Sequence, residues 1–281
     1  MLKVGYLGPE GTFSDEASAL YKKKIGNAEF IPYSTFHDIL IAVDKNKIDE
    51  GIVPIENSVE GTIGIVTDML VNEVKLQIKQ ELVIPVNHYL LAKSKVPLNK
   101  ISEVISHPQV IDQCKNYLRK KLPKAKIRFS YSTAEAAKQV ATTIELSNNK
   151  IFAAISNKAS AKLYGLKIVD SKVNDYPDNS TRFVVLAKSD HKKTGNDKTS
   201  IVFSILKDRP GGLHNILAEF AKIKINLTKI ESRPTKRTLG GYYFFVDIQG
   251  HRIDKDISQA LKEVKKKASF FKILGSYPRS S

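Results

Sequence analysis

The segment Lys3–Ser14, KVGYLGPEGTFS, joins a short apolar strand pattern to a glycine-rich turn that leads into a helix pattern. A glycine-rich turn that opens a helix presents free backbone N–H groups and the positive end of the helix dipole. This arrangement suits a carboxylate or a phosphate. The glycine spacing does not match the dinucleotide-binding fingerprint. A plain strand–helix turn with Ser14 as the helix N-cap would explain the same residues.

Outward from this segment, strand and helix patterns alternate to about residue 188. Amphipathic stretches at Pro108–Lys121 and Thr133–Thr142 separate apolar runs, with Thr133 marking an expected helix start. The expected strands are Lys3–Leu7, Glu50–Pro54, Leu82–Leu91, Glu103–Ser106, Lys126–Phe129, Ile151–Ser156, Lys167–Val169 and Phe183–Ala187. Near-continuous apolar strands that alternate with helices predict α/β layers around a largely parallel sheet.

The composition changes at Ser189–Lys198, SDHKKTGNDK, which is wholly polar and without periodicity. We therefore expect a linker there. The order after it is strand, helix, strand, strand, helix, strand, which is the ferredoxin-like βαββαβ arrangement. The expected elements are Ser200–Leu206, Gly211–Ile223, Ile225–Ser232, Tyr242–Ile248, Asp254–Lys267 and Phe270–Tyr277.

The chain of 281 residues carries a net charge of +16, and residues 198–281 hold 17 Lys and Arg against 7 Asp and Glu. Such a balance invites a nucleic-acid interpretation. However, the lysines are scattered along helical faces, and solvated helices or attraction for a small anion explain the charge equally well. The single cysteine excludes an intrachain disulfide and fits a reducing cytoplasm. The sequence predicts neither a secretory signal nor a membrane span.

A second polar motif, Pro54–Thr62 or PIENSVEGT, follows an expected strand and precedes the helical run IVTDMLV. The carboxyl ends of strands are where open α/β sheets bind ligands. Asn57, Ser58 and Thr62 offer neutral hydrogen-bonding groups for such a ligand. The structural alternative assigns Asn57 and Ser58 to helix capping.

A third motif, Ser106–Cys114 or SHPQVIDQC, also follows a strand and starts a helix. Pro108 takes the favoured first-turn position. His107 could titrate or simply cap the helix. Cys114 falls on the expected apolar face, so we expect a buried small residue and not a nucleophile, since no partner base is visible.

A fourth motif, Asp178–Phe183 or DNSTRF, enters an expected strand. Arg182 could hold a carboxylate through two parallel hydrogen bonds, and a surface salt bridge is the alternative. The sequence contains no P-loop, no His/Cys metal spacing and no Gly-x-Ser-x-Gly elbow. Cofactor-dependent, metal-dependent and acyl-transfer chemistries therefore lack support.

The four motifs GPEGTFS, PIENSVEGT, SHPQ with the following QC, and NSTRF resemble, in this order, the prephenate dehydratase family over residues 5–186. The tail resembles an ACT domain. Asp208–Leu213 looks like its first strand–helix turn, and Ile225–Pro234 looks like its ESRP strand. The resemblance covers nearly the whole chain.

The resemblance implies an α/β fold with a two-lobed, periplasmic-binding-protein-like catalytic domain at residues 1–188. A linker at 189–198 and a ferredoxin-like βαββαβ ACT domain at 199–277 would follow. The first lobe would hold about 1–78 and 170–188 and the second about 79–169, with the active site in the cleft between them. The family uses no metal or organic cofactor and converts prephenate to phenylpyruvate, water and carbon dioxide.

The resemblance makes Thr181 and Arg182 the catalytic candidates. We expect Thr181 to donate a hydrogen bond as charge develops on the leaving hydroxide. We expect Arg182 and the N–H groups near residues 12–14 to hold the carboxylate that remains. The substrate-binding candidates are Thr12, Phe13, Ser14, Asn57, Ser58, Thr62, Gln109 and Phe183. For Glu56 and His107, substrate contact and the orienting of neighbours both stay open.

ACT domains usually pair and bind an amino acid between subunits, so the resemblance implies phenylalanine as effector and a homodimer or homotetramer through this domain. The effector-binding candidates are Asp208, Gly211, Gly212, Leu213, Asn226, Leu227, Glu231 and Ser232. Gly212 stands where the family usually has Ala, and His214 follows it, which leaves the sign of the response open. A domain kept only for dimerisation is the structural alternative.

Three other functions stay in competition. A ligand-binding regulator without catalysis is disfavoured by the presence of Thr181 and Arg182. An arogenate dehydratase would use the same chemistry, and the sequence does not separate it from the prephenate enzyme. Nucleic-acid binding by the basic tail lacks any accompanying recognition motif.

Overall fold

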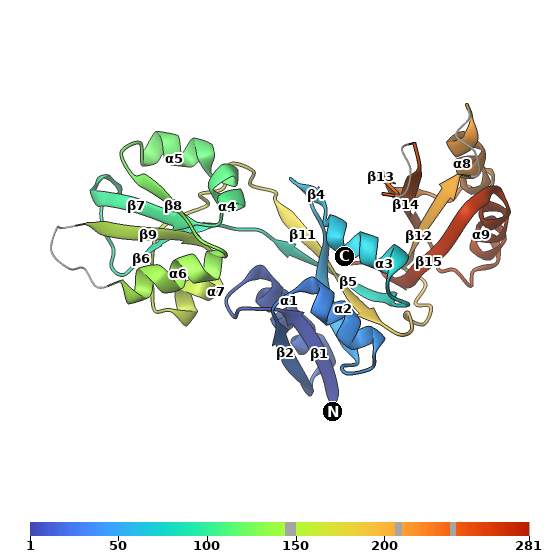
Figure 1. Ribbon diagram of the computed structural model, residues 1–281, viewed down its shortest axis with the longest axis horizontal. Helices are drawn as coiled ribbons and strands as arrows, with labels where there is room; N and C mark the ends of the chain where they lie inside the picture. The colour runs from blue at the N-terminus through green and yellow to red at the C-terminus, as the bar shows by residue number, and fades with distance from the viewer. Residues whose placement is uncertain (144–149, 206–209, 237–239, 281) are drawn as a thin grey trace.

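The computed structural model describes residues 1–143, 150–205, 210–236 and 240–280. Its strands form three sheets that follow one another along the long axis of the molecule (Figure 1). We call the middle sheet with its helices lobe 1, the sheet on the left lobe 2, and the sheet on the right the C-terminal domain. The expected α/β, two-lobed body followed by a βαββαβ domain is confirmed.

Lobe 1 has a six-stranded sheet in the order β2-β1-β3-β11-β5, with β4 paired to β3. Its strands are β1 (Leu2–Leu7), β2 (Ala28–Tyr33), β3 (Glu50–Asn57), β4 (Gly61–Thr62), β5 (Gln77–Pro85) and β11 (Ser180–Ala187). The helices are α1 (Phe13–Ile25), α2 (Phe36–Asp44) and α3 (Gly64–Asn72). Buried side chains of α1 pack with Phe183 and Val185, whereas those of α2 and α3 pack with Val184 and Leu186. The helices therefore cover opposite faces of the sheet.

Lobe 2 has a five-stranded sheet in the order β10-β6-β9-β7-β8. Its strands are β6 (Tyr89–Ala92), β7 (Ile101–Ser106), β8 (Lys126–Phe129), β9 (Ile151–Ser156) and β10 (Lys167–Ser171). The helices are the 3₁₀ turn η1 (Leu98–Lys100), α4 (Pro108–Gln113), α5 (Lys115–Lys121), α6 (Thr133–Thr142) and α7 (Lys158–Leu163).

Both sheets are mixed, which corrects the expectation of a largely parallel sheet. β11 runs antiparallel to β3 and β5, and β6 runs antiparallel to β9 and β10. The cause is that the chain leaves lobe 1 after β5 and returns to it as β11, so the returning strand enters the sheet reversed. The expected strand Leu82–Leu91 is accordingly two strands. The chain crosses between Pro85 and Tyr89, later than the expected lobe boundary near residue 78.

Helix starts and breaks differ slightly from the sequence pattern. Thr12, not Ser14, caps α1 by accepting a hydrogen bond from the Asp15 N–H, and Ser132, not Thr133, caps α6 in the same way. In each case a hydroxyl residue earlier in the chain can also cap, and the pattern does not rank the two. The expected helix Pro108–Lys121 is divided into α4 and α5 at Cys114, while Pro108 does take the first-turn position.

The C-terminal domain follows the expected βαββαβ order. Its elements are β12 (Asp197–Ile205), α8 (Gly212–Lys222), β13 (Leu227–Pro234), β14 (Tyr242–Gln249), α9 (Lys255–Lys267) and β15 (Ala268–Pro278). The four strands form an antiparallel sheet in the order β13-β14-β12-β15. Both helices pack on one face of this sheet, so the other face needs a different cover.

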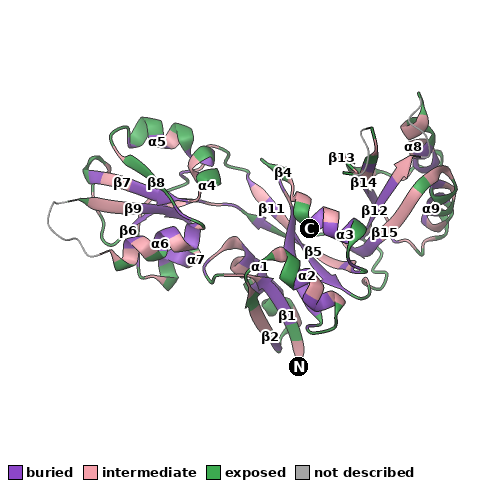
Figure 2. Cartoon of the chain, in the orientation of Figure 1, coloured by how far each residue is buried: buried purple, intermediate pink, exposed green. Residues whose placement is uncertain are grey.

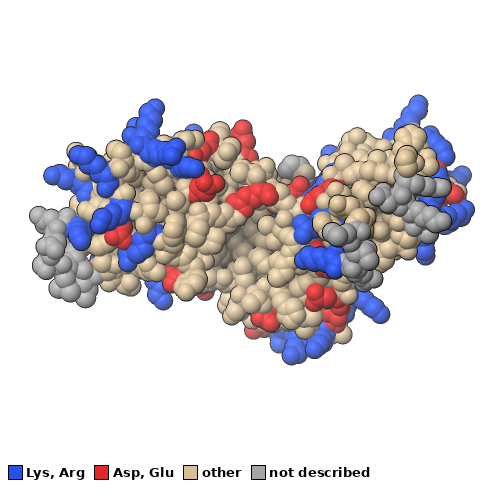
Figure 3. Space-filling model, turned by 45° about the horizontal axis from the view of Figure 1, so that its top comes forward, with Lys and Arg blue, Asp and Glu red and all other residues tan. Residues whose placement is uncertain are grey.

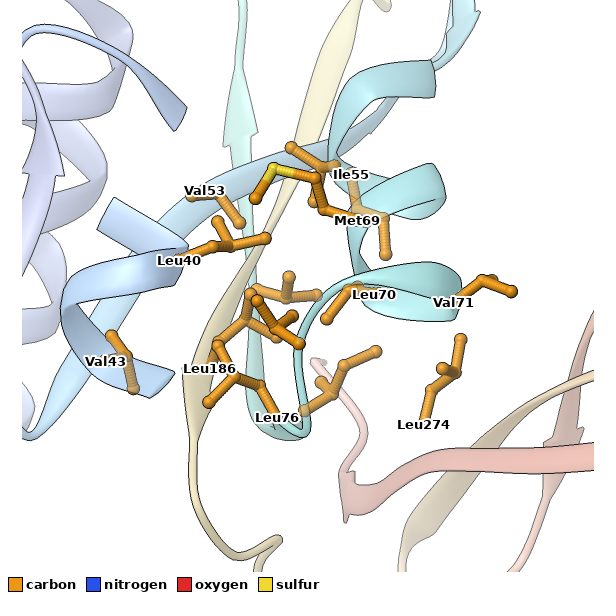
Figure 4. Packing of buried hydrophobic residues seen from close by; sticks show 14 of the residues in the cluster. Leu40, Val43, Val53, Ile55, Met69, Leu70, Val71, Leu76, Leu186 and Leu274 are labelled. Atoms are coloured by element: carbon orange, nitrogen blue, oxygen red, sulfur yellow. The ribbon is translucent and has the colours of Figure 1, made fainter. Parts of the chain in front are cut away.

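That cover is lobe 1. One continuous apolar cluster holds residues of α2, α3, β3 and β11 together with Val202, Tyr243, Phe245, Leu274 and Tyr277 of the C-terminal domain. Figure 4 shows Leu274 of β15 at the edge of the group that contains Leu70, Val71 and Leu76. The interface is therefore buried as a domain core is. The strands β3 and β11 of lobe 1 are almost wholly buried, and on the C-terminal side β12 is largely buried while β15 is partly so (Figure 2).

Basic side chains are spread over lobe 2 and the C-terminal domain, and a further group lies on the middle part of the molecule at the bottom of the view (Figure 3). In the part of the chain that the structure describes, no helix is long and apolar enough to span a membrane.

Candidate active site

A cavity of about 320 Å³ lies between lobe 1 and lobe 2. Its wall combines strand ends of lobe 1, the segment where the chain first crosses between the lobes, and helix starts from both lobes. The lining residues are Thr12, Phe13, Ser14, Phe36, Pro54, Asn57, Glu60, Ile63, Val86, His88, His107, Gln109, Val110, Gln113, Tyr131, Ser132, Thr133, Thr181 and Phe183. None of these described residues is Lys or Arg.

Thr181 and Asn57 meet at the lobe 1 side of this cavity. They are direct partners across the β3–β11 ladder, and Asn57 Nδ2 donates to Thr181 Oγ1 at 2.9 Å. Asn57 Oδ1 accepts from the N–H groups of Val59 and Glu60, which fixes the amide with its NH₂ group toward Thr181. Because Thr181 Oγ1 accepts this bond, its own proton stays available for donation to a ligand.

A chain of hydrogen bonds continues from Asn57 into lobe 2. Asn57 Nδ2 donates to Asn179 Oδ1 at 2.9 Å, and Asn179 Nδ2 donates to Gln113 Oε1 at 3.3 Å. Gln113 Oε1 also contacts His88 Nε2 at 3.0 Å, and Gln113 Nε2 donates to Glu60. The amide oxygen can only accept, so His88 carries its proton on Nε2. The chain ties the catalytic candidate of lobe 1 to a helix of lobe 2.

Burial changes the titration of two groups in this chain. It lowers the pKa of His88, against a smaller opposing effect of the Gln113 hydrogen bond, so the ring stays neutral at physiological pH. It raises the pKa of Glu60, partly offset by the hydrogen bond from Gln113. The first shift favours the neutral ring of His88, and the second favours the neutral form of Glu60.

Two helix N-termini point positive dipole ends at the cavity. α1 begins at Phe13 with Thr12 as its cap, and α6 begins at Thr133 with Ser132 as its cap. First-turn N–H groups have no acceptor within their own helix. Together with the dipole they suit an anion. The apolar side chains of Phe36, Val86, Val110 and Phe183 form the rest of the wall.

The structure brings together most of the substrate-binding candidates. Thr12, Phe13, Ser14, Asn57, Gln109, Thr181 and Phe183 all line the cavity, and His107 joins them. Ser58 lies just behind the wall, where its hydroxyl contacts Asn179 Oδ1 at 3.3 Å and accepts from the Ser180 N–H. Thr62 lies elsewhere, because its hydroxyl bonds Glu231 and Lys229 of the C-terminal domain.

Arg182 also lies away from the cavity, and the predicted contact with a substrate carboxylate is wrong for this arrangement. Adjacent residues of a strand point to opposite faces, so Thr181 faces the cleft and Arg182 faces the C-terminal domain. Its guanidinium pairs with Glu56, Glu81 and Asp247. Burial opposes the charge on Arg182, but these carboxylates, Asp247 foremost, hold its pKa above the ordinary value.

The sequence motifs missed several cavity residues. His88 lies where the chain crosses between the lobes, and the prediction of one strand over Leu82–Leu91 hid that crossing. Gln113 belongs to the third motif but had no predicted role. It lies one helical turn after Gln109, a spacing that places both side chains on the same face of the helix. Thr133 was predicted only as a helix start, and Ser132 was given no role.

The effector-binding candidates do not form one site within the chain. Gly211, in a left-handed conformation with φ of 79°, precedes Gly212 and Leu213 at the start of α8, near the end of the sheet where β12 stops. Asn226 and Leu227 lie at the other end, since Leu227 pairs with Ile248 and the Asn226 carbonyl accepts from Gln249. Asp208 lies outside the described residues.

Glu231 and Ser232 lie on opposite faces of β13. Glu231 faces lobe 1, where it contacts Lys229 and Thr62, whereas Ser232 pairs with Phe244 and is exposed. Glu231 is therefore part of the interface with lobe 1, which conflicts with its prediction as a ligand for an ammonium group in this arrangement.

Two further predictions concern metals and thiols. Cys114 is fully buried between α4 and α5, and burial raises the pKa of its thiol, as expected for a packing residue. Among the described residues, no cluster of His, Cys, Asp and Glu side chains could hold a metal ion.

Comparison with known proteins places this architecture among characterised families. Residues 4–191 match the family model for prephenate dehydratase, and residues 199–266 match that for the ACT domain. A bifunctional chorismate mutase/prephenate dehydratase from Aquifex aeolicus is 40% identical over 99% of this chain and 74% of its own length. A prephenate dehydratase from Methanocaldococcus jannaschii is 39% identical over 98% of this chain and 97% of its own length.

A solved structure is similar over the same length. The crystal structure of prephenate dehydratase from Arthrobacter aurescens in complex with L-Phe superposes with a TM-score of 0.86 at 33% identity. The match covers 99% of this chain and 90% of that one.

Proposed function

Since this chain belongs to the prephenate dehydratase family, we propose that it binds prephenate in the cavity between its lobes and converts it to phenylpyruvate, water and carbon dioxide. The observation that carries this proposal is the meeting of Thr181, Asn57 and two helix N-termini around one cavity whose described lining holds no Lys or Arg. Residues 1–188 would form the catalytic domain and residues 199–277 the regulatory domain, joined by 189–198, although β12 already begins at Asp197 and β15 ends at Pro278.

Prephenate has two carboxylates and a ring hydroxyl. One C–C bond breaks to release carbon dioxide, and its electron pair moves through the ring as the C–O bond to the hydroxyl breaks. The ring becomes aromatic, so the enzyme has to orient the dianion and assist the departing hydroxide. Thr181 donates its free hydroxyl proton as a hydrogen bond to that oxygen, while Asn57 holds the threonine oxygen from behind.

The retained carboxylate lies at the N–H groups of Phe13 and Ser14 at the start of α1. The departing carboxylate needs a weak partner, because a tight ion pair would stabilise the ground state more than the transition state. Apolar side chains such as Phe36 and Val86, together with the absence of Lys and Arg from the described lining, meet this need. Gln109 and Gln113 are placed to contact the ring substituents, and no cofactor is required for any step.

The C-terminal domain would sense phenylalanine, which shares the phenyl ring of the product. The candidate residues at the two ends of its sheet, Gly211–Leu213 and Asn226–Leu227, can form one site only if two chains contribute, so we include a homo-oligomer through this domain. The relative bound to L-Phe supports the same ligand. We also propose a cytoplasmic location, where the lone thiol of Cys114 stays reduced.

The test is turnover of prephenate at neutral pH, followed by phenylpyruvate formation, with arogenate as the competing substrate. We expect a higher kcat/KM for prephenate. Added phenylalanine should change the rate of turnover and raise the melting temperature. At a concentration a hundredfold above its Kd, it should add about 2.7 kcal/mol to the free energy of unfolding. Turnover of arogenate alone would reassign the substrate, and an unchanged melting temperature at millimolar phenylalanine would remove the sensor role.

A further inference from the structure

The side chain of Arg182, on β11, contacts side chains of four other strands from two domains. Its NH1 atom lies 2.9 Å from Asp247 Oδ2 of β14, and its NH2 atom lies 2.9 Å from Glu56 Oε2 of β3. The same NH1 atom is 3.4 Å from both Glu81 Oε2 of β5 and the hydroxyl of Tyr277 of β15. Arg182 is thus a cation shared by the lobe 1 sheet and the C-terminal sheet, and Lys198 and Lys229 of the C-terminal domain pair with Glu81 and Glu56 across the same interface.

This network is buried and therefore sensitive to the loss of any member. The side chain of Arg182 is 12% exposed, that of Glu81 3% and that of Asp247 8%. Removing one partner of a buried ion pair leaves an uncompensated charge in a low dielectric. Asp247 is held in turn by the hydroxyl of Ser200, which also bonds Tyr277.

The network lies directly behind the catalytic pair. In the β3–β11 ladder Thr181 is paired with Asn57, and the next pair is Arg182 with Glu56. The register shifts immediately afterwards, where Phe183 pairs with Pro54 and Ile55 is skipped. A bulge of this kind weakens the ladder locally and re-aims side chains. Pairing of β11 with β5 runs unbroken from Ser180 to Val185, so only the β3 side of Thr181 is weakened in this way. On that side the ladder depends more on side-chain bonds, and those of Arg182 are the closest in sequence.

We propose that Arg182 is a positioning residue that couples the docked C-terminal domain to Thr181. By pairing with Asp247 on one side and Glu56 on the other, it holds β3 and β11 in the register that lets Asn57 donate to Thr181. The inference rests on the proposed dehydratase function and assigns Arg182 no contact with substrate. Arg182 lines its own cavity of about 20 Å³, with Ser200, Lys229 and Asp247.

The carboxylate of Glu56 also connects to β13, the strand that carries three of the effector candidates, Leu227, Glu231 and Ser232. Glu56 Oε2 lies 3.3 Å from Lys229 Nζ, and Lys229 lies 3.3 Å from Glu231 Oε2 on β13. A movement of β13 relative to lobe 1 would therefore change the charge balance around Glu56 and Arg182. Coupling of this kind requires that an effector bind the two arrangements with different affinity.

The decisive variant is Asp247→Asn, because it removes the charge in the C-terminal domain, keeps the shape, and leaves the cavity residues intact. We expect kcat for prephenate to fall about 10-fold while KM changes less than about 3-fold. Arg182→Ala should lower kcat in the same way. The double variant with Asp247→Asn and Arg182→Ala should have a kcat no lower than that of Arg182→Ala alone. Arg182→Lys should have a kcat between that of Arg182→Ala and that of the wild-type chain. A wild-type kcat in Asp247→Asn, or a rise in KM alone in Arg182→Ala, would overturn the proposal.

Arg252→Gln is the matched control, since it breaks another 2.9 Å ion pair, with Asp190, that does not touch β3 or β11. We expect unchanged kcat in this control. Amide hydrogen exchange gives a second readout independent of turnover. Exchange at residues 55–57 and 180–183 should be faster in Asp247→Asn than in Arg252→Gln, and equal exchange would also overturn the proposal. If the wild-type chain turned over no prephenate, the proposed function would fail, while the exchange comparison would still decide the coupling.

Discussion

The two faces of the β3–β11 ladder differ in almost every physical respect. The face that carries Thr181 and Asn57 opens on a cavity of about 320 Å³ and is bonded by neutral amides. The face that carries Arg182 and Glu56 is closed by the C-terminal domain and is held by ion pairs. Neighbouring residues of one strand therefore face the cavity on one side and the docked C-terminal domain on the other.

This difference shows how the chain can place a hydroxyl without placing a charge beside it. A cation at the cavity would bind the departing carboxylate and oppose its loss. With Arg182 turned away, the positive ends of α1 and α6 attract the substrate as partial charges spread over several N–H groups. The full charges lie behind the strand, where they can fix its position.

The largest expected effect separates the two faces by removing only the hydroxyl that we propose acts in catalysis. Thr181→Ala should lower kcat by about 100-fold or more and leave KM nearly unchanged, since the hydrogen bond forms mainly in the transition state. Its melting temperature should stay close to that of the wild-type chain. Thr181→Ser, which keeps the hydroxyl, is the control and should retain most of the activity. Near-normal turnover of the alanine variant would remove Thr181 from the mechanism.

The second effect tests the docking face. Gly275 of β15 has a φ of 148°, and a Cβ added there would lie 2.6 Å from the backbone nitrogen of Ile78 on β5. Gly275→Ala should cost about 3 kcal/mol or more of unfolding free energy, because the steric overlap adds to the backbone strain. Urea denaturation measures this loss.

Gly195→Ala provides the comparison, since its φ is 96° but nothing lies within 4 Å of an added Cβ. It should cost about 1 kcal/mol from backbone strain alone. Equal losses of unfolding free energy in the two variants would show that the close packing of β15 on β5 does not contribute to stability.

The smallest effect concerns the contact between the lobes. Burial, with repulsion from Asp15, raises the pKa of Glu16 to about 7, against the N–H of Ala159 in lobe 2, which lowers it. The folded chain then holds its proton more tightly than the unfolded chain, so ionised Glu16 costs stability. That cost is absent at low pH, grows as pH rises toward 7, and is complete above it.

Glu16→Gln should therefore stabilise the chain at pH 8 by about 1 kcal/mol, after allowance for solvent screening, and have little effect at pH 4. Denaturation curves at the two pH values measure the difference. Glu10→Gln, at an exposed position in the preceding turn, is the control and should show no such dependence on pH. The same stabilisation at both pH values would contradict a raised pKa.

Much of this architecture could be predicted from local sequence. The βαββαβ order of the tail follows from the spacing of its apolar runs, and the Gly-rich and polar motifs fall at strand ends, as the sequence pattern indicates. The convergence of residues 12–14, 57, 109 and 181 on one cavity was also predicted. Each of these features depends on residues close together in the chain or on the general geometry of α/β sheets.

The remaining features depend on contacts that no local pattern records. Arg182 follows Thr181 within a recognised motif, yet only the position of the C-terminal domain reveals that carboxylates from three strands surround it. Thr62 likewise bonds Lys229, which is 167 positions away in the sequence. His88 was missed because an apolar run does not show where a chain passes from one sheet to another.

The apolar cluster that runs from α2 through β11 to β15 has a consequence for cooperativity. The change in composition near residue 190 suggests two separate domains, but this apolar cluster continues across the boundary between them. Lobe 2, although it lies within the catalytic sequence, has clusters of its own that share no described side chain with that cluster. On heating, lobe 1 and the C-terminal domain should melt as one unit, and the inserted lobe should be the part able to unfold by itself.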